Sequence, residues 1–265
     1  MHANFNHQDY SFTFNHLYEL WRSTKGLMLR ALFAAHAKIS GSKQKSLLWT
    51  YEQFELSAHS ILLKGYFEGI VPLPSMSSGD RIKWHDPEIR TIIPLNDFKT
   101  QRSFRRFLRK DERQAPHMKL ELRINSNFKE TIEACAKPRQ TTKRTWITPH
   151  YIDIALELHK MGIAHSMEVY QNNALVGGII GYSINSYFAG ITSFYKIENA
   201  SKVAQYYLLL RLKEDGFHFY DSGWETKWLK QFGMIIIPRE EFHKCFIKAM
   251  ITPAKLKNEI PELVI

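Results

Sequence analysis

The chain has 265 residues, of which 44% are hydrophobic and 13% aromatic, so it can bury a sizeable core and is not a disordered chain. Its 36 Lys and Arg against 26 Asp and Glu give a formal net charge of +10, which favours an anionic partner, most often nucleic acid or a membrane surface. Because no apolar run approaches the ~18 residues of a membrane span and the N-terminus lacks a signal-peptide pattern, we expect a cytoplasmic protein.

The first part of the chain is expected to be separate from the rest. Residues 1–50 are interpreted as a helical N-terminal extension, because apolar residues recur at helical spacing between Phe14 and Ile39, with cations between them. Such a helix either covers core or offers a basic face to RNA or a membrane. Residues 51–115 are expected to form a smaller N-terminal lobe with a strand over Thr91–Leu95.

The densest basic cluster lies at residues 101–110, where Phe104, Phe107 and Leu108 share one side of a predicted helix. The other sides carry cations that can neutralise nucleic-acid phosphates, although an ordinary amphipathic surface helix has the same pattern. The candidate phosphate-binding residues are Arg102, Arg105, Arg106, Arg109 and Lys110.

Residues 116–265 are expected to form the main domain, organised around three strands at Ala164–Tyr170, Ala174–Ile184 and Tyr187–Tyr195. Asn-rich turns separate these strands, because Asn tolerates the left-handed backbone of tight hairpins. The other predicted elements are a strand over Lys119–Ile124, helices over Asn127–Ala136, Thr148–Met161, Ser201–Asp215 and Glu225–Phe232, and strands over Phe217–Asp221 and Met234–Ile237.

This order of elements predicts an α+β fold with a mostly antiparallel sheet, resembling the GCN5-related N-acetyltransferase (GNAT) fold. Enzymes of that fold bind the coenzyme A pyrophosphate with a Gly-rich turn at a helix start, and no such turn precedes Ser201. Gly177, Gly178 and Gly181 lie inside a strand instead, where glycine lets a backbone or a ligand approach closely. Coenzyme A is therefore disfavoured.

The cysteines and histidines show no ligand spacing. Cys135 and Cys245 lie far apart, and the 12 His form neither HxxxH nor HExxH. We expect no disulfide framework and no metal.

Seven segments, in order, resemble the leucyl/phenylalanyl-tRNA–protein transferases, bacterial enzymes that move an amino acid from aminoacyl-tRNA to a protein N-terminus. They fall within about residues 56–245, and AHS-x-EV, LVGG and NASK are the most specific. The segments are Ile82–Arg90, Arg102–Ser103, Thr145–Ile147, Ala164–Val169, Leu175–Gly178, Glu198–Lys202 and Ile237–Arg239.

The resemblance implies an aminoacyltransferase that takes aminoacyl-tRNA as donor and an amine of a protein, peptide or small molecule as acceptor. It implies no cofactor, because an aminoacyl ester is already activated and needs mainly positioning and oxyanion stabilisation. Trp84 and Trp146 would lie near the terminal adenosine, where aromatic stacking is effective, and Lys202 near phosphate. Core packing of each Trp and solvation of Lys202 are the plain alternatives.

By the same alignment, six residues would line a pocket for the aminoacyl side chain: Ile179, Phe188, Ser193, Leu208, Leu212 and Tyr220. Ser193 stands where the family has Met, and Tyr220 where it commonly has an aliphatic residue. Unpaired buried hydroxyls cost about 1–3 kcal/mol, so the pocket favours a donor that can hydrogen-bond them. We therefore expect a donor specificity changed from Leu or Phe.

Two polar positions of the family are also altered. Ile191 replaces a Glu in the third strand, and Gly223 replaces the Gln of an Asp-x-Gln motif whose Asp221 is retained. Asp221 is the expected catalytic residue on the proton route, and Glu225 is the candidate to replace part of the lost function. Replacing Asp221 by Ala is expected to abolish transfer with little loss of folding.

Three classes of function are weighed. The leading one is an aminoacyl-tRNA-dependent transferase; the others are a catalytically impaired tRNA-binding homologue and an acyltransferase that uses a CoA or carrier-protein thioester. Oligomeric state has no signal in the sequence.

Overall fold

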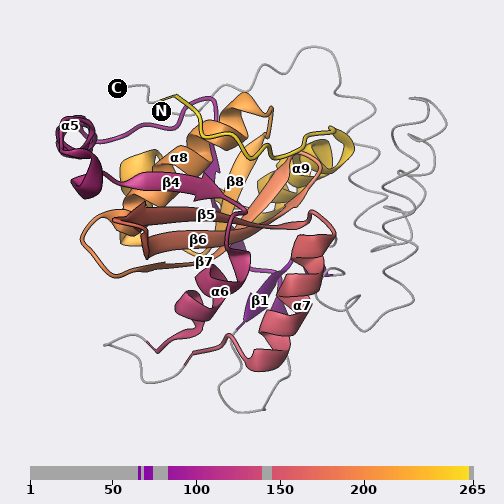
Figure 1. The fold of residues 1–265 in the computed structure, drawn as a ribbon. Helices are drawn as coiled ribbons and strands as arrows, with labels where there is room; N and C mark the ends of the chain where they lie inside the picture. The colour runs from indigo at the N-terminus through magenta and orange to yellow at the C-terminus, as the bar shows by residue number, and fades with distance from the viewer. Residues whose placement is uncertain (1–64, 67–68, 74–82, 139–144, 263–265) are drawn as a thin grey trace.

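The computed structural model describes residues 65–66, 69–73, 83–138 and 145–262, so the helical extension expected over 1–50 lies outside the described residues. The centre of the molecule is a seven-stranded sheet with the order β4-β5-β6-β7-β8-β3-β9 (Figure 1). Only its β7–β8 pair is parallel, which confirms a mixed α+β fold with a mostly antiparallel sheet. The strands are β3 (Ile89–Pro94), β4 (Glu121–Ile124), β5 (Ala164–Gln171), β6 (Ala174–Ile184), β7 (Tyr187–Tyr195), β8 (Phe219–Gly223) and β9 (Ile235–Pro238).

A separate two-stranded sheet pairs β1 (Val71–Leu73) with β2 (Lys83–His85). The helical elements are α5 (Arg102–Glu112), η2 (Pro116–Met118), α6 (Phe128–Ala136), α7 (Pro149–Lys160), α8 (Ala200–Glu214), η3 (Lys227–Phe232) and α9 (Arg239–Ile251). Helix α8 covers one face of the large sheet, while α6 and α7 lie on the other, as Figure 1 shows. Helix α9 joins the core on the α6–α7 face, which we call the tyrosine face because four buried tyrosines lie there.

The predicted three-strand meander is confirmed, with β6 and β7 ending at the predicted residues. The turn between β5 and β6 places Asn172 and Asn173 at φ values of 49° and 59°, and the β6–β7 turn places Asn185 at 52°. These are left-handed conformations that Asn adopts more easily than most residues, which is why the sequence locates the turns well.

Two of the expected elements near the C-terminus differ, and one helix there was not expected. The helix predicted over Glu225–Phe232 is a 3-10 helix that begins only at Lys227, and Thr226 before it makes no side-chain cap. The strand predicted from Phe217 begins two residues later, where pairing with β7 begins. Helix α9 was not predicted, although Pro238 before it and acidic residues in its first turn are typical start signals.

Strand β3 lies inside the large sheet, between β8 and β9. Its residues belong to the segment expected to form a separate N-terminal lobe, so the large sheet extends across the boundary expected at residue 115. The strand is buried from Arg90 onward, because helix α9 packs against it on the tyrosine face.

The glycines of β6 serve helix packing. A Cβ on Gly177 would lie 2.6 Å from that of Ala200 at the start of α8, and one on Gly178 would lie 2.9 Å from Thr131 of α6. The close approach expected at these glycines is therefore made by the two flanking helices and not by a ligand.

Candidate active site

The candidate site lies where β7 and β8 separate. Their parallel pairing runs from Tyr187↔Phe219 to Ala189↔Asp221 and then ends, since β8 continues only with β3 and β7 only with β6. The β7 residues beyond this point, from Gly190 to Phe194, are half-buried although the strand lies inside the sheet. Backbone groups on that edge of β7 lack a strand partner and face the separation, which makes it a natural place for a substrate.

A bulge in β7 falls at the same place. Ile180 pairs with Thr192, but the next β6 residue, Gly181, pairs with Gly190, so Ile191 is the extra residue. Bulges bend a strand and redirect its side chains, and they occur often beside active sites. Ile191 packs against the tyrosine face, whereas Ser193, opposite Ile179, faces α8. The two residues thus face opposite sides of the sheet.

Asp221 sits in a fully buried polar cluster on the tyrosine face. Arg90 of β3 forms an ion pair with its Oδ2, and the Tyr187 hydroxyl donates to the same oxygen at 2.7 Å. The Gly223 amide donates to Oδ1 at 2.8 Å. With an exposure of 1%, this carboxylate is engaged through both oxygens and holds three elements together.

Arg90 is the residue that sequence reasoning missed at this site. It is fully buried, donates to the Gly69 carbonyl at 2.6 Å, and its guanidinium lies 3.9 Å from the centre of the Phe242 ring. Burial alone would lower the pKa of Arg90, but the Asp221 carboxylate beside it holds that pKa above its usual value. The arginine therefore stays charged inside the core. Its signal in the sequence is a single Arg in an otherwise apolar strand.

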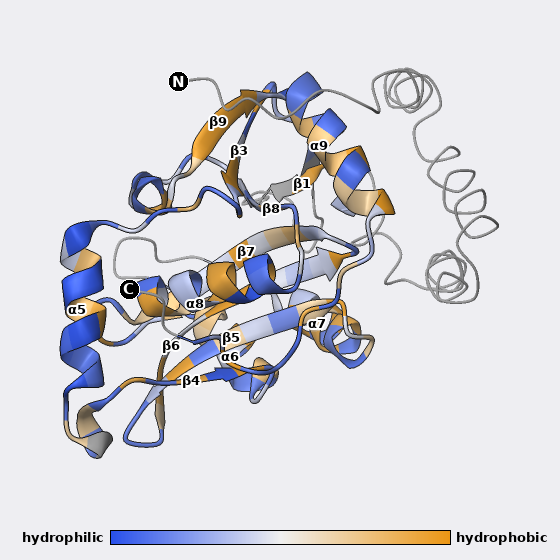
Figure 2. Cartoon of the chain, turned by 90° about the horizontal axis from the view of Figure 1, so that it is seen from above, coloured by the Kyte–Doolittle hydropathy of each residue, from blue (hydrophilic) through white to orange (hydrophobic). Residues whose placement is uncertain are grey.

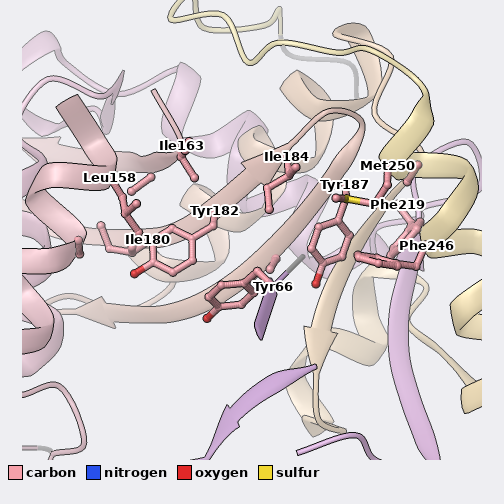
Figure 3. Packing of buried hydrophobic residues seen from close by; sticks show 14 of the residues in the cluster. Tyr66, Leu158, Ile163, Ile180, Tyr182, Ile184, Tyr187, Phe219, Phe246 and Met250 are labelled. Carbon is pink, nitrogen blue, oxygen red and sulfur yellow. The ribbon is translucent and has the colours of Figure 1, made fainter. Parts of the chain in front are cut away.

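A row of buried tyrosines extends from this cluster across the tyrosine face. Tyr66, Tyr182 and Tyr187 direct their hydroxyls to the same side of the sheet in Figure 3, and the Tyr182 hydroxyl donates to that of Tyr151 at 2.7 Å. Burial raises the pKa of each of these phenols well above its usual value. The hydroxyls are therefore neutral near pH 7 and act as hydrogen-bond donors.

Of the two expected tryptophans, Trp146 lies beside the row. Trp146 is half-buried and packs edge-on against Tyr151, with ring centres 4.9 Å apart. Trp84 lies in β2, and its side chain lies outside the described residues. Glu225 is exposed and pairs with Lys230 at 2.5 Å, away from the Asp221 cluster. An exposed Trp224 beside it stacks on His85 with ring centres 5.9 Å apart.

The six residues expected to line a pocket all lie on the α8 face. Five of them belong to one buried core cluster and are at most 3% exposed, while Ser193 is half-buried. Tyr220 stacks on Phe188 with ring centres 5.8 Å apart. Its hydroxyl lies over Gly190, where a Cβ would be 1.7 Å away, so no larger residue fits at that position.

Side chains of the AHS-x-EV segment connect β5 to the loop that precedes α6. Glu168 is fully buried and accepts hydrogen bonds from the backbone amides of Ser126 and Asn127, both at 3.2 Å, and from the Ser166 hydroxyl. His165 accepts from Asn125 at 3.1 Å through Nδ1 and donates to Ser183 at 2.8 Å through Nε2. These motif residues are structural, because they fix the loop that starts α6.

The cations of α5 all point outward, while Phe104 and Leu108 pack into the core, and Figure 2 shows the hydrophilic colour along most of this helix. Within the part of the chain that the structure describes, no carboxylate forms an ion pair with Arg102, Arg105, Arg106, Arg109 or Lys110. Lys202 instead donates to the side chain of Asn199 at 2.9 Å, at the start of α8. The row on α5 is thus free for phosphates.

Two further features limit the chemistry of the described residues. They contain no group of three or more His, Cys, Asp or Glu side chains arranged for a metal ion. Their helices include none that is long and apolar enough to cross a membrane.

Comparison with known proteins adds relatives to this geometry. A sequence model of the leucyl/phenylalanyl-tRNA protein transferases matches residues 92–246. A leucyl/phenylalanyl-tRNA–protein transferase of Salinibacter ruber is 35% identical over 190 residues, covering 72% of this chain and 79% of that protein. One of Pseudoalteromonas atlantica is 38% identical, covering 68% and 74%. Among solved structures, FemX aligns at a TM-score of 0.42 and 14% identity over 68% of this chain and 66% of FemX, which is too low to support an argument.

Proposed function

The chain belongs to the leucyl/phenylalanyl-tRNA protein transferase family, and from this premise we propose that it is an enzyme that moves an amino acid from aminoacyl-tRNA to an acceptor amine. The amine nitrogen attacks the ester carbonyl, an amide bond forms, the bond to the ribose oxygen breaks, and one proton passes from the amine to that oxygen. The acceptor is a protein N-terminus, a peptide or a small-molecule amine.

One observation carries the proposal: β7 and β8 separate after the Ala189↔Asp221 pair, with the residues expected to line the pocket on one side of the sheet and the Asp221 cluster on the other. An aminoacyl ester with its side chain in the pocket has its carbonyl near the β7 bulge. Backbone amides of β7 that lack a strand partner are suitable donors to the tetrahedral oxyanion, and such donors usually supply the largest share of catalysis in acyl transfer.

Asp221 is proposed to act from behind the reacting atoms. Its oxygens are already engaged by Arg90, Tyr187 and Gly223, and the Arg90 guanidinium balances its charge, so Asp221 is proposed to position these groups and not to act as a free base. Glu225, exposed at the surface four residues later, is proposed to attract a cationic acceptor. Ile191 supplies no such charge.

The donor tRNA is proposed to lie along α5, where five unpaired cations are exposed on one helix. Trp84 and Trp146 remain the proposed contacts for the terminal adenosine, and Lys202 for a phosphate. We also propose a GNAT-like fold, supported by the parallel β7–β8 pair joined through α8 next to an antiparallel meander, and a cytoplasmic location, where aminoacyl-tRNA is made.

Transfer is tested with the full chain, one tRNA body charged with radiolabelled amino acids, and peptides that begin with Arg or Lys. Labelled peptide that depends on the enzyme supports the proposal. Tight, salt-sensitive binding of aminoacyl-tRNA without product supports the second candidate, an impaired tRNA-binding homologue, which the replacements at Ile191 and Gly223 favour. Labelled acyl-CoA is tested as an alternative donor. Product formed from acyl-CoA but not from aminoacyl-tRNA would overturn the proposal.

A further inference from the structure

We propose that the pocket on the α8 face selects a donor whose aminoacyl side chain is neutral and able to hydrogen-bond. Gln205 is the residue that would bind this side chain. This inference rests on the proposed function. Gln205 lies on α8 three residues before Leu208 and seven before Leu212, so all three share one helix face. It is therefore a seventh lining residue, beside the six expected from the sequence.

The Gln205 amide is buried; neither polar atom meets the geometry of a hydrogen bond within the described residues, and its polar neighbour is the Tyr220 hydroxyl. Its side chain is 0% exposed. Native proteins rarely leave both ends of a buried amide in this condition, because each buried unsatisfied group is destabilising. A ligand that supplies the missing partners removes the penalty when it binds.

Two hydroxyl-bearing side chains lie on the same face. Tyr220 is close enough for the Gln205 amide to lower the pKa of the phenol, against burial, which raises that pKa more strongly. The Tyr220 hydroxyl lies over Gly190, at the separation of β7 and β8 where a substrate enters. Ser193, half-buried and paired with Ile179, adds a hydroxyl at the open end of the lining.

The rest of the lining excludes charge. Ile179, Phe188, Leu208 and Leu212 are apolar and at most 2% exposed, and none of them can compensate an ionised group. A side chain that enters must therefore be neutral and offer both a donor and an acceptor to an amide and a phenol. Gln, Asn, Tyr and neutral His meet this description, whereas Leu and Phe leave Gln205 unpaired.

The experiment charges one tRNA body separately with Gln, Asn, Tyr, His, Leu, Phe and Met, and measures kcat/KM for transfer to a peptide with an N-terminal Arg. At least one neutral polar donor is expected to exceed Leu and Phe by tenfold or more, because sites built to hydrogen-bond a substrate reject analogues that lack the group by up to ~10⁴-fold. Preference for Leu or Phe by the wild-type chain would overturn the inference while leaving the proposed function intact.

Variants of Gln205 and Tyr220 test whether these residues cause the preference for a polar donor. Gln205→Leu is expected to reduce transfer of the polar donor at least tenfold, to raise transfer of Leu, and to raise Tm by a few degrees, because it replaces an unsatisfied amide. Tyr220→Phe is expected to weaken the preference for the polar donor in the same direction. Tyr207→Phe is the matched control: it removes a hydroxyl from the opposite side of α8 and leaves the order of donors unchanged.

A readout that does not require turnover separates this inference from the proposed function. Affinities are measured for tRNA carrying a non-hydrolysable amide-linked Gln, Tyr or Leu. Tighter binding of the polar forms that is lost in Gln205→Leu supports the inference even if no product forms. Equal affinities for all three overturn it, and the absence of binding to any charged tRNA overturns the proposed function with it.

Discussion

The two faces of the large sheet treat buried polar groups in opposite ways at the same separation of strands. On the tyrosine face, Asp221 and Arg90 are paired with each other and each has further hydrogen bonds, although Arg90 Nε has no hydrogen-bond partner among the described residues. On the α8 face, Gln205 is equally buried and its amide atoms have no partner among the described residues.

This difference assigns different tasks to the two faces. A polar cluster satisfied from within is a rigid frame, which depends on every member and gains little from a ligand. A buried amide whose geometry leaves it without full hydrogen bonds can gain them from a group that enters. We therefore expect variants on the tyrosine face to lose stability and variants at Gln205 to change specificity, and the predictions that follow test this contrast.

The largest effect is expected at Arg90. Arg90→Met leaves Asp221 charged and unpaired in the core and is expected to lower the free energy of unfolding by about 3–5 kcal/mol in urea titrations. The double variant Arg90→Met/Asp221→Leu is the control, since it removes both charges and should recover most of the loss. A single variant as stable as the wild type would show that the pair is not the frame of this face.

The same ion pair revises the expectation for Asp221. Asp221→Ala was expected to abolish transfer with little loss of folding. However, it would leave the Arg90 guanidinium, which is 0% exposed, without its carboxylate partner. Loss of activity in this variant would therefore include loss of folded enzyme. Activity must be compared at equal fractions of folded protein, measured by the same titration.

The second effect is a pH dependence from His165, which lies on the α8 face behind Phe188 and, unlike Gln205, is hydrogen-bonded. Burial lowers its pKa from 6.5 to about 4, with His159 adding to the shift. Between these values the unfolded chain binds a proton that the folded chain does not, so stability is lost as the pH falls from 6.5 towards 4. The loss is roughly 3 kcal/mol.

His165→Gln should flatten that slope. Unfolding free energies of both proteins are measured at several pH values from 7 to 4, and the wild type should approach the variant as the pH falls. Parallel curves would contradict a buried neutral imidazole. Because the variant loses ring hydrogen bonds at every pH, the change with pH is informative and the constant offset is not.

A smaller effect is expected from Tyr187→Phe on the tyrosine face. The variant removes one of the three hydrogen bonds that Asp221 accepts and should lower the free energy of unfolding by about 2 kcal/mol, as is typical of a bond to a charged group. Tyr182→Phe is a matched control, because it removes a buried hydroxyl that bonds only another tyrosine. Transfer by folded enzyme should fall for Tyr187→Phe and not for Tyr182→Phe.

The smallest effect on stability is expected outside both faces, on α5. Arg105→Gln and Arg109→Gln should change the free energy of unfolding by less than about 0.5 kcal/mol, because both side chains are exposed and unpaired. Each should weaken tRNA binding and reduce the slope of log affinity against log salt by about 0.7–0.9. Lys129→Gln, an exposed cation on α6, is the control that should leave the slope unchanged.

Features that depend on neighbouring residues could be predicted from the sequence. The meander and its Asn turns follow from patterns within a few residues, and the six residues expected to line a pocket lie on one face of the sheet. Sequence reasoning could not place β3 in the large sheet or find the partner of Asp221, because Arg90 lies 131 residues before it. Gln205 was overlooked because one polar residue in an apolar helix resembles an ordinary surface position.

The position of β3 also has a consequence for how the chain is made. Its partners β8 and β9 leave the ribosome only after more than a hundred further residues, roughly 6–25 s at about 5–20 residues per second. During that time an apolar strand with a lone arginine has no sheet to join. The candidate site, which needs Arg90 beside Asp221, thus forms only near the end of synthesis. We therefore expect a nascent chain to be inactive towards the charged tRNAs that the ribosome itself is using.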